Sequence, residues 1–360
     1  MRRAVTACPQ PSPGVVGMAR AWVTVVLLSG VCAACSAGTV GPPPAPPVDW
    51  HAFDVHRPKP ATTTPTAKER ALAEGYALAL ASPGEAQLAS RLDDDAHFAF
   101  PGMADARSRE QVVKAHELLF GPFDERRVTT TRVWHTDSIQ TLEWVLTGVH
   151  VRTWMGVAAT HKPVIFKGLT LLWTKDDGSI TDVHVYFDVA VVKAQLGAGP
   201  KELQGLPPPA SPSAGPQVID QTGAPEEMAS VAVVRAELDA LESSNEPTYV
   251  SLVADDIEVY SPERARPARG KEEASRAYFR SMHGAIAQLD TTIDSAWGLA
   301  TFAIVEYSIA GDQIGPIAWV PAVRDRVVRL DIVDIAEVHD GKISRVWRYD
   351  NLVQLTAPGP

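Results

Sequence analysis

The hydrophobic positions of this chain follow a helical period first and a strand period afterwards. Leu72, Tyr76 and Leu80 recur at intervals of four in a run of good helix formers, and a second amphipathic stretch covers about 108–120. Beyond it, apolar and polar residues alternate. The alternation predicts strands near 127–135, 139–149, 163–174 and 179–188, after a shorter strand that runs into 98–102.

The second half of the chain repeats this order. Val231, Val234, Leu238 and Leu241 form the same helical stripe, and a further helix is expected at about 271–283. Strands are expected near 287–296, 300–310, 326–338 and 342–350, after a shorter one that runs into 257–262. Helices followed by four antiparallel strands predict, in each half, an α+β domain whose helices pack on one face of a bent sheet.

Sequence landmarks support the same division into two copies. Residues 143–148 match residues 306–311, which lie 163 positions later. The segment from Asp94-Asp95 to Pro101 matches the segment from Asp255-Asp256 to Pro262. The predicted hairpin turns, Asp177-Gly178 and Asp340-Gly341, follow in the same order. The chain therefore contains one domain twice, and function has to be sought in each copy separately.

The first 35 residues differ from the rest. An apolar run from Ala21 to Val31 follows Arg20; it is too short to span a bilayer comfortably but suits the core of a signal peptide. The small residues before Cys35 resemble the lipobox of bacterial lipoproteins, which implies lipidation of Cys35. An ordinary secretory signal is the alternative. The prediction is an exported lipoprotein, anchored through its lipid on the periplasmic face or outer membrane of a bacterial envelope.

Composition sets further bounds. The segment 36–65 is rich in Pro, Thr and Ala and is expected to be an extended spacer, and 198–224 is expected to be a Pro-rich linker between domains at 66–197 and 225–358. No cysteine follows Cys35, so neither domain can hold a disulfide or a zinc–thiolate site. A net charge of −10 argues against nucleic-acid binding.

The ordered motifs resemble the SnoaL-like (polyketide cyclase-like) branch of the nuclear transport factor 2-like superfamily, which includes ketosteroid isomerase. In the first copy they are Asp94-Asp95 to Pro101, 107–110, 147–150, 177–180, 184–188 and 195–197; in the second they are Asp255-Asp256 to Pro262, 310–311, 340–343, 347–350 and 354–355. The resemblance implies two tandem cone-shaped domains, each with a conical pocket for a small, largely apolar molecule. Enzymes of this kind perform acid/base chemistry such as cyclisation, isomerisation or epoxide opening.

The resemblance assigns the general acid/base, by position, to Asp188 in the first copy and Asp350 in the second. His184, Tyr186 and Asp188 alternate on one strand and should project from one face. If that face lines the pocket, apolar surroundings would raise the pKa of Asp188, and His184 or Tyr186 could donate a hydrogen bond to a developing enolate. Alternatively, the opposite face with Val183, Val185 and Phe187 is the core and the trio faces water.

The second copy departs from this pattern. Without gaps, His184 aligns with Trp347, Tyr186 with Tyr349 and Phe187 with Asp350, which leaves Asp188 opposite Asn351. Either a one-residue bulge returns Asp350 to the pocket, or the two copies no longer carry the same acid.

Several other residues are candidates with two interpretations. Trp144, His150, Trp154, Trp173 and Tyr349 could line an apolar ligand pocket or simply pack in the core. Glu143 and Glu306 could be pocket acids, although solvated strand residues are the favoured interpretation. The histidines at 150, 161 and 184 lack the spacing of a metal site, so no metal or other cofactor is expected.

Two functions fit these features. One is an envelope-anchored cyclase- or isomerase-like enzyme that uses Asp188 with His184 and Tyr186. The other is a non-catalytic lipoprotein that binds a small hydrophobic molecule or a partner, and the export signal favours it. Because domains of this superfamily commonly dimerise, the two copies are expected to form a pseudo-dimer within one chain.

Overall fold

The computed structural model describes residues 75–81, 86–207, 216–323 and 326–356. The predicted signal peptide, Cys35 and the spacer at 36–65 lie outside the described residues. Within those ranges, the helices are all too short or too polar to cross a membrane.

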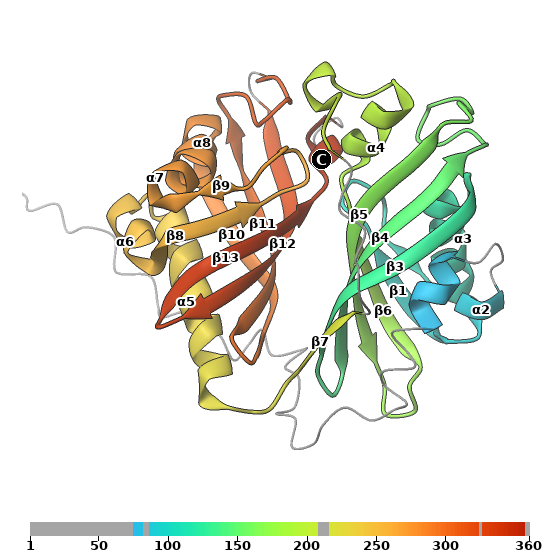
Figure 1. The fold of residues 1–360 in the computed structure, drawn as a ribbon, viewed down its shortest axis with the longest axis horizontal. Helices are drawn as coiled ribbons and strands as arrows, with labels where there is room; N and C mark the ends of the chain where they lie inside the picture. Colours follow the sequence, from blue (N-terminus) through green and yellow to red (C-terminus); the bar gives the residue numbers. More distant parts are fainter. Residues whose placement is uncertain (1–74, 82–85, 208–215, 324–325, 357–360) are drawn as a thin grey trace, which may run out of the picture. The chain divides into compact units, whose positions relative to one another are not determined.

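As far as it is described, the first domain has a seven-stranded sheet in the order β2-β1-β6-β5-β4-β3-β7 (Figure 1). Its strands are β1 (Leu92–Ala99), β2 (Ala106–Arg107), β3 (Phe123–His135), β4 (Ile139–His150), β5 (Pro163–Thr174), β6 (Ile180–Tyr186) and β7 (Gln217–Asp220). Its helices are a segment at 75–81, α2 (Ala86–Ala89), α3 (Arg109–Phe120) and α4 (Val189–Leu196).

The described part of the second domain repeats this plan with six strands in the order β10-β11-β12-β13-β8-β9. These are β8 (Val253–Tyr260), β9 (Ala268–Arg269), β10 (Ile286–Leu299), β11 (Phe302–Gln313), β12 (Val327–His339) and β13 (Lys342–Asp350). Its helices are α5 (Pro225–Glu242), α6 (Glu246–Leu252), α7 (Gly270–Ala274), the π-helical η3 (Ser275–Phe279), α8 (Arg280–Ala285) and the 3-10 helix η4 (Leu352–Thr356).

The α+β prediction is confirmed, and the four long antiparallel strands of each half are present. The sheets are nevertheless mixed, because β1 pairs in parallel with β6 and β8 pairs in parallel with β13. The expected linker is also partly structured: 198–224 contains the 3-10 helix η2 (Lys201–Leu203) and β7, which pairs in parallel with β3.

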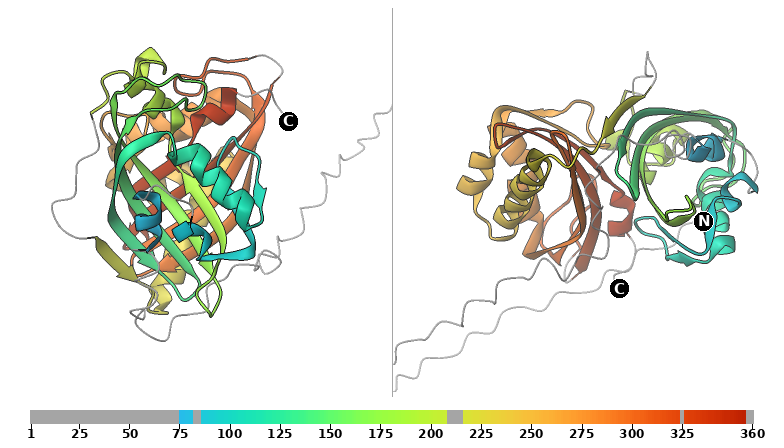
Figure 2. Two further views of the ribbon diagram at one scale, coloured as in Figure 1. Left: turned by 90° about the vertical axis from the view of Figure 1, so that its right-hand side faces the viewer. Right: turned by 90° about the horizontal axis from the view of Figure 1, so that it is seen from below.

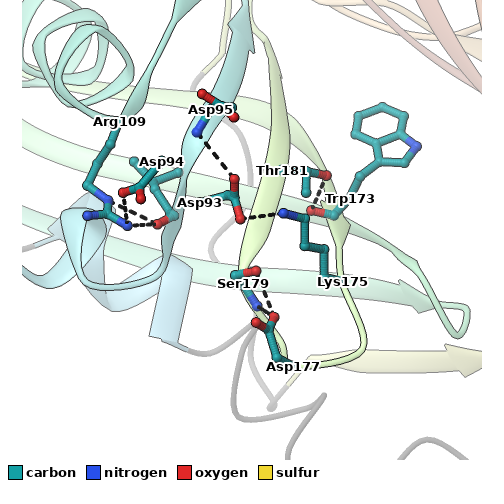
Figure 3. A network of polar contacts seen from close by, with 10 residues as sticks. Asp93, Asp94, Asp95, Arg109, Trp173, Lys175, Asp177, Ser179 and Thr181 are labelled. Atoms are coloured by element: carbon teal, nitrogen blue, oxygen red, sulfur yellow. Dashed lines mark hydrogen bonds and ion pairs between the residues drawn. The ribbon is translucent and has the colours of Figure 1, made fainter.

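Some of the repeated sequence motifs form ion pairs between a helix and a strand. Figure 3 shows Arg109, at the start of α3, bound to Asp94 with an Nη2–Oδ1 distance of 2.8 Å. Arg109 also donates to the carbonyl of Leu92. In the second domain Lys271 binds Asp255 in the same way, with an Nζ–Oδ1 distance of 2.6 Å. The matched acidic and basic motifs therefore tie a helix to the first strand of each sheet.

The hydrophobic residues of each domain form a core between its sheet and its helices. The other faces of the sheets share a further cluster, to which Trp134, Trp173 and Tyr186 of the first domain and Trp297, Phe302 and Tyr349 of the second contribute. In Figure 2, helix α3 of the first domain (teal) and helix α5 of the second (yellow) lie on the faces of the sheets that are turned away from this cluster. The sheets thus contact each other through side chains that a single domain would expose.

Candidate functional site

Strand β6 and Phe187, which follows it directly, have side chains in two environments. Val183, Val185 and Phe187 are fully buried in the core of the first domain. His184 and Tyr186 point to the opposite face and reach Glu306 of the second domain, with distances to its Oε1 of 2.6 Å from His184 Nδ1 and 2.8 Å from the donating Tyr186 hydroxyl. The face opposite the core therefore meets the other domain rather than water.

Asp188 does not lie on the same strand. Strand β6 ends at Tyr186, and Asp188 caps helix α4 by accepting a hydrogen bond from the Ala190 N–H to its Oδ1 at 2.7 Å. Its Oδ2 is buried and has no hydrogen-bond partner within the described residues. Burial raises the pKa of Asp188 to about 7, although the Ala190 N–H favours the charged form.

Glu143 and Glu306 occupy matched positions, and the prediction that they are solvated is wrong. Their exposed fractions are 2% and 4%, because the sheet of the other domain covers them. Glu306 accepts hydrogen bonds from Tyr186 and, at 2.9 Å, from the Ser295 hydroxyl. Glu143 correspondingly accepts one from the Tyr349 hydroxyl. Each domain therefore binds the buried glutamate of the other with a tyrosine, Tyr186 of β6 or Tyr349 of β13.

Charges stabilise both glutamates in their ionised form. Arg132 binds Glu143 through Nε and Nη2 at 2.9 and 2.6 Å, and Lys167 forms a further ion pair with it. Burial opposes ionisation, but Lys167 and Arg132 together outweigh it and hold the pKa of Glu143 at about 2. Burial also raises the pKa of Glu306, but the neighbouring His184 outweighs this effect, so the pKa of Glu306 is lowered.

A cavity of about 1050 Å³ lies beside the Glu143 cluster. Its walls come from β4, β5 and α4 of the first domain, from the segment 203–207, and from the β8–β9 connection and β13 of the second. The apolar lining includes Val145, Ile165, Phe166, Val191, Leu206 and Trp347. The predicted residue Tyr349 lines this cavity, and so does Asp188.

The other predicted aromatic residues pack in cores. Trp144, Trp154 and His150 are buried within the first domain, where Trp144 donates to Thr170 Oγ1 at 3.0 Å and Trp154 to the Leu119 carbonyl at 2.9 Å. His150 Nδ1 lies 3.1 Å from Thr160 Oγ1. Trp173 lies in the cluster between the sheets, with its ring 4.5 Å from that of His184. The interior of the first domain is therefore filled by aromatic side chains.

The second domain has a different interior. Asp350 pairs with Ile332 in a register that shifts only near Glu337, so no bulge is present at Asp350 and it occupies the position that Phe187 has in the first domain. It lines a cavity of about 580 Å³ together with Arg348, Tyr278, Met282, Trp319 and Leu352. Asp350 Oδ1 is buried without a hydrogen-bond partner in the described ranges, and burial raises its pKa well above the usual value.

Sequence reasoning missed the charges beside Asp350. Arg348 binds Asp334 through two nitrogens, at 2.9 and 2.6 Å, and Tyr307 donates to Asp334 at 2.8 Å. Burial raises the pKa of Glu237 to about 8, and Asp334 adds to this effect. The signal was present in the alternation of β13, since Val346, Arg348 and Asp350 share one face.

Fold and site together define the class: cone-shaped α+β domains in tandem, with a cavity in the second cone and another beside the shared sheet faces. Family models confirm it. Residues 71–196 match the SnoaL-like polyketide cyclase model, and residues 234–346 match a model of the SnoaL-like domain. The chain contains two tandem SnoaL-like domains.

Solved structures with similar folds have low sequence identity to this chain. A protein with a ketosteroid isomerase-like fold from Catenulispora acidiphila, in complex with trimethylamine, is 22% identical, with a TM-score of 0.31 over 38% of this chain and 95% of its own. An LEH-like epoxide hydrolase from M. tuberculosis is 20% identical, with a TM-score of 0.30 over 37% and 90%. TsrD from Streptomyces laurentii is 22% identical, with a TM-score of 0.32 over 36% and 92%. A search of the curated proteins found no match.

Proposed function

We propose that this protein binds a small, largely apolar molecule in the cavity beside the Glu143 cluster, without catalysing a reaction there. The observation that carries the proposal is the lining of that cavity: its 1050 Å³ have extensive apolar walls, Glu143 and Lys167 are paired with each other, Arg348 is paired with Asp334, and Asp188 caps α4. Cavities of roughly 300–1,000 Å³ suit small ligands. Glu143 is held as a carboxylate and is a poor general base.

Binding can be tested with the neutral fluorophore 1-N-phenylnaphthylamine, which is excited in its own absorption band and not through the tryptophans of the protein. The wild-type protein should enhance its fluorescence, and Val191→Trp should weaken binding by at least about tenfold, because Val191 lines the cavity and the indole would occupy part of it beside α4. Val327→Trp is the matched control, since Val327 is 54% exposed and lies away from the cavity. Equal affinity in wild type and Val191→Trp would overturn the assigned cavity.

A second candidate function is acid/base catalysis in the cone of the second domain. The sequence pointed to Asp188 with His184 and Tyr186, but those two side chains are bound to Glu306. Asp188 and Asp350 each line a cavity and each have one oxygen without a hydrogen-bond partner among the described residues. Asp188 also caps α4 through its other oxygen, and Asp350 is therefore the candidate acid/base. A carboxyl group with a raised pKa can transfer a proton near neutral pH.

Exchange of the α-hydrogens of cyclohexanone in D₂O, followed by NMR, tests this candidate. Acceleration by the wild type that is lost in Asp350→Asn and kept in Asp188→Asn would support it. A wild-type protein that does not accelerate the exchange, or an Asp350→Asn variant as active as the wild type, would exclude Asp350 as the base for such a ketone.

The proposed location is the bacterial envelope, with the lipid on Cys35 as anchor. Incorporation of a labelled fatty acid into the wild type but not into Cys35→Ala, with the variant released from the membrane fraction, would support it. Label retained in Cys35→Ala would contradict it.

The proposed assembly is an intrachain pseudo-dimer, so that the full-length chain is a monomer in solution. The reciprocal contacts of Tyr186 with Glu306 and of Tyr349 with Glu143 support it. Light scattering that gives twice the mass of one chain would count against it.

A further inference from the structure

Two histidines and an aspartate of the first domain converge on its sheet. His97 on β1 is paired with Asp182 on β6, and His184 lies two residues farther along β6 on the same face. One potential ligand atom from each lies within 4.8 Å of the other two. Their side chains are about one-fifth to one-quarter exposed, at 20%, 25% and 19%, so an ion could enter from solvent.

The orientation of His184 is that of a metal ligand. Its Nδ1 lies 2.6 Å from Glu306 Oε1, so an Nδ1–H donated to the carboxylate leaves the Nε2 lone pair free. That Nε2 is buried, and no described residue forms a hydrogen bond with it. Metal-binding histidines usually donate their second ring N–H to a carboxylate or carbonyl in this way.

His97 has the same kind of support. Its Nε2 lies 3.1 Å from Asp105 Oδ2, while its Nδ1 lies 3.3 Å from Asp182 Oδ1. Zinc–nitrogen and zinc–oxygen bonds of about 2.0–2.1 Å place the ligands of a tetrahedral ion about 3.3 Å apart. The separation of the His97 and Asp182 atoms therefore already matches one edge of a zinc coordination tetrahedron.

From this geometry we propose that His97, Asp182 and His184 bind a divalent transition-metal ion such as Zn²⁺, with Asp105 and Glu306 as partners of the two imidazoles. Imidazole and carboxylate donors suit such ions. Three protein ligands leave a coordination position for water. Because Glu306 belongs to the second domain, metal binding would be coupled to the contact between the two sheets.

The three proposed ligands come from the first domain, and the second domain does not repeat them. The positions matching His97 and Asp182 are Glu258 and Arg345, which form an ion pair at 3.6 Å, and His184 is matched by Trp347. The second domain therefore serves as an internal reference that keeps the strand pairing without these donors.

Calorimetric titration of the metal-stripped full-length protein with ZnCl₂ tests the proposal, together with the visible spectrum of the Co²⁺ complex. We expect one ion per chain, with affinity at least about tenfold weaker in His97→Gln, His184→Gln and the partly exposed Asp182→Asn, and about 10–100-fold weaker in Glu306→Gln. His339→Gln is the matched control, because His339 lies outside the proposed site and pairs with Glu337 at 3.0 Å.

Circular dichroism of the metal-free variants distinguishes a lost ligand from a lost fold. A folded His184→Gln or Asp182→Asn variant that binds Zn²⁺ as tightly as the wild type would overturn the site, as would a wild-type protein that binds no Zn²⁺. A Zn²⁺-dependent rise in Tm of the wild type and of His339→Gln that is absent from Asp182→Asn would support it.

Discussion

The interiors of the two domains differ at positions that their backbones share. Strand pairing places Thr170 and Asp334 at the same position, and likewise Val185 and Arg348. In the first domain a neutral Trp144–Thr170 hydrogen bond lies in an aromatic core, whereas in the second Tyr307, Asp334 and Arg348 form a charged cluster. One cone is filled by Phe187, and the other keeps Asp350 and a cavity. The duplicated fold thus tolerates two chemically opposite interiors.

The faces between the sheets differ less. Glu143 and Glu306 are each bound by the tyrosine of the other domain, and what varies is the accompanying basic side chain: Arg132 with Lys167 in one case and His184 in the other. These faces stay alike because each has to fit the other, while the interior of each domain packs mainly against its own helices.

The largest effect should come from the charged interior. Replacing Arg348 by Ala leaves the buried Asp334 carboxylate without its cation, which we expect to lower the free energy of unfolding by about 3–5 kcal/mol in urea denaturation. Arg345→Ala, which removes a half-exposed partner of Glu337, should cost less than about 1 kcal/mol. Similar losses in both variants would show that the cluster does not stabilise the second domain.

A dependence on pH should follow from Asp188. Its pKa rises from 3.8 to about 7 on folding, so the folded protein binds more protons than the unfolded chain between these values. Relative to Asp188→Asn, which can still cap α4, the wild type should lose up to roughly 4 kcal/mol of stability as the pH rises from about 4 to about 7. Denaturation across this range measures the difference; a constant offset would refute it.

The reciprocal tyrosines offer a smaller and paired test. A hydrogen bond to a charged group contributes about 1.5–3 kcal/mol, and Tyr186→Phe removes one from Glu306. Tyr349→Phe should cost less, because Arg132 and Lys167 still bind Glu143. Urea denaturation of the two variants under one buffer condition measures both losses. The reverse order would indicate that these cations do not compensate for the lost hydroxyl.

The smallest effect is expected at the repeated surface motif. Arg109→Ala removes a partly exposed ion pair with Asp94 and should lower the free energy of unfolding by less than about 1 kcal/mol. Lys271→Ala in the second domain is its counterpart and should match it, because Lys271 binds Asp255 in the same way. Thermal denaturation compares the two. A large loss in one domain alone would mean that the motif has different roles in the two copies.

The sequence predicted the long strands well because their hydrophobic alternation is strong and the Asp-Gly turns separate them. It did not predict that β1 pairs in parallel with β6, since no local signal encodes that neighbour. For the same reason Glu143 and Glu306 looked solvated: alternation tells which residues share a face, but the covering sheet belongs to the other half of the chain. His97 and His184 met only through the unpredicted pairing, so their spacing gave no sign of a shared site.

Strand β7 has a consequence for self-association. It pairs with Arg132 to His135 of β3 and so covers part of the outermost long strand of the first sheet. In the second sheet β10 lies at the border, where Asp290, Asp294 and two register shifts hinder pairing with another molecule. Strand β3 has two register shifts of its own, so both outermost long strands are bulged, and the first sheet has in addition the cover of the segment that leads to its neighbour. A deletion that removed β7 would therefore expose the edge of β3 for pairing with another molecule, besides shortening the connection between the two domains.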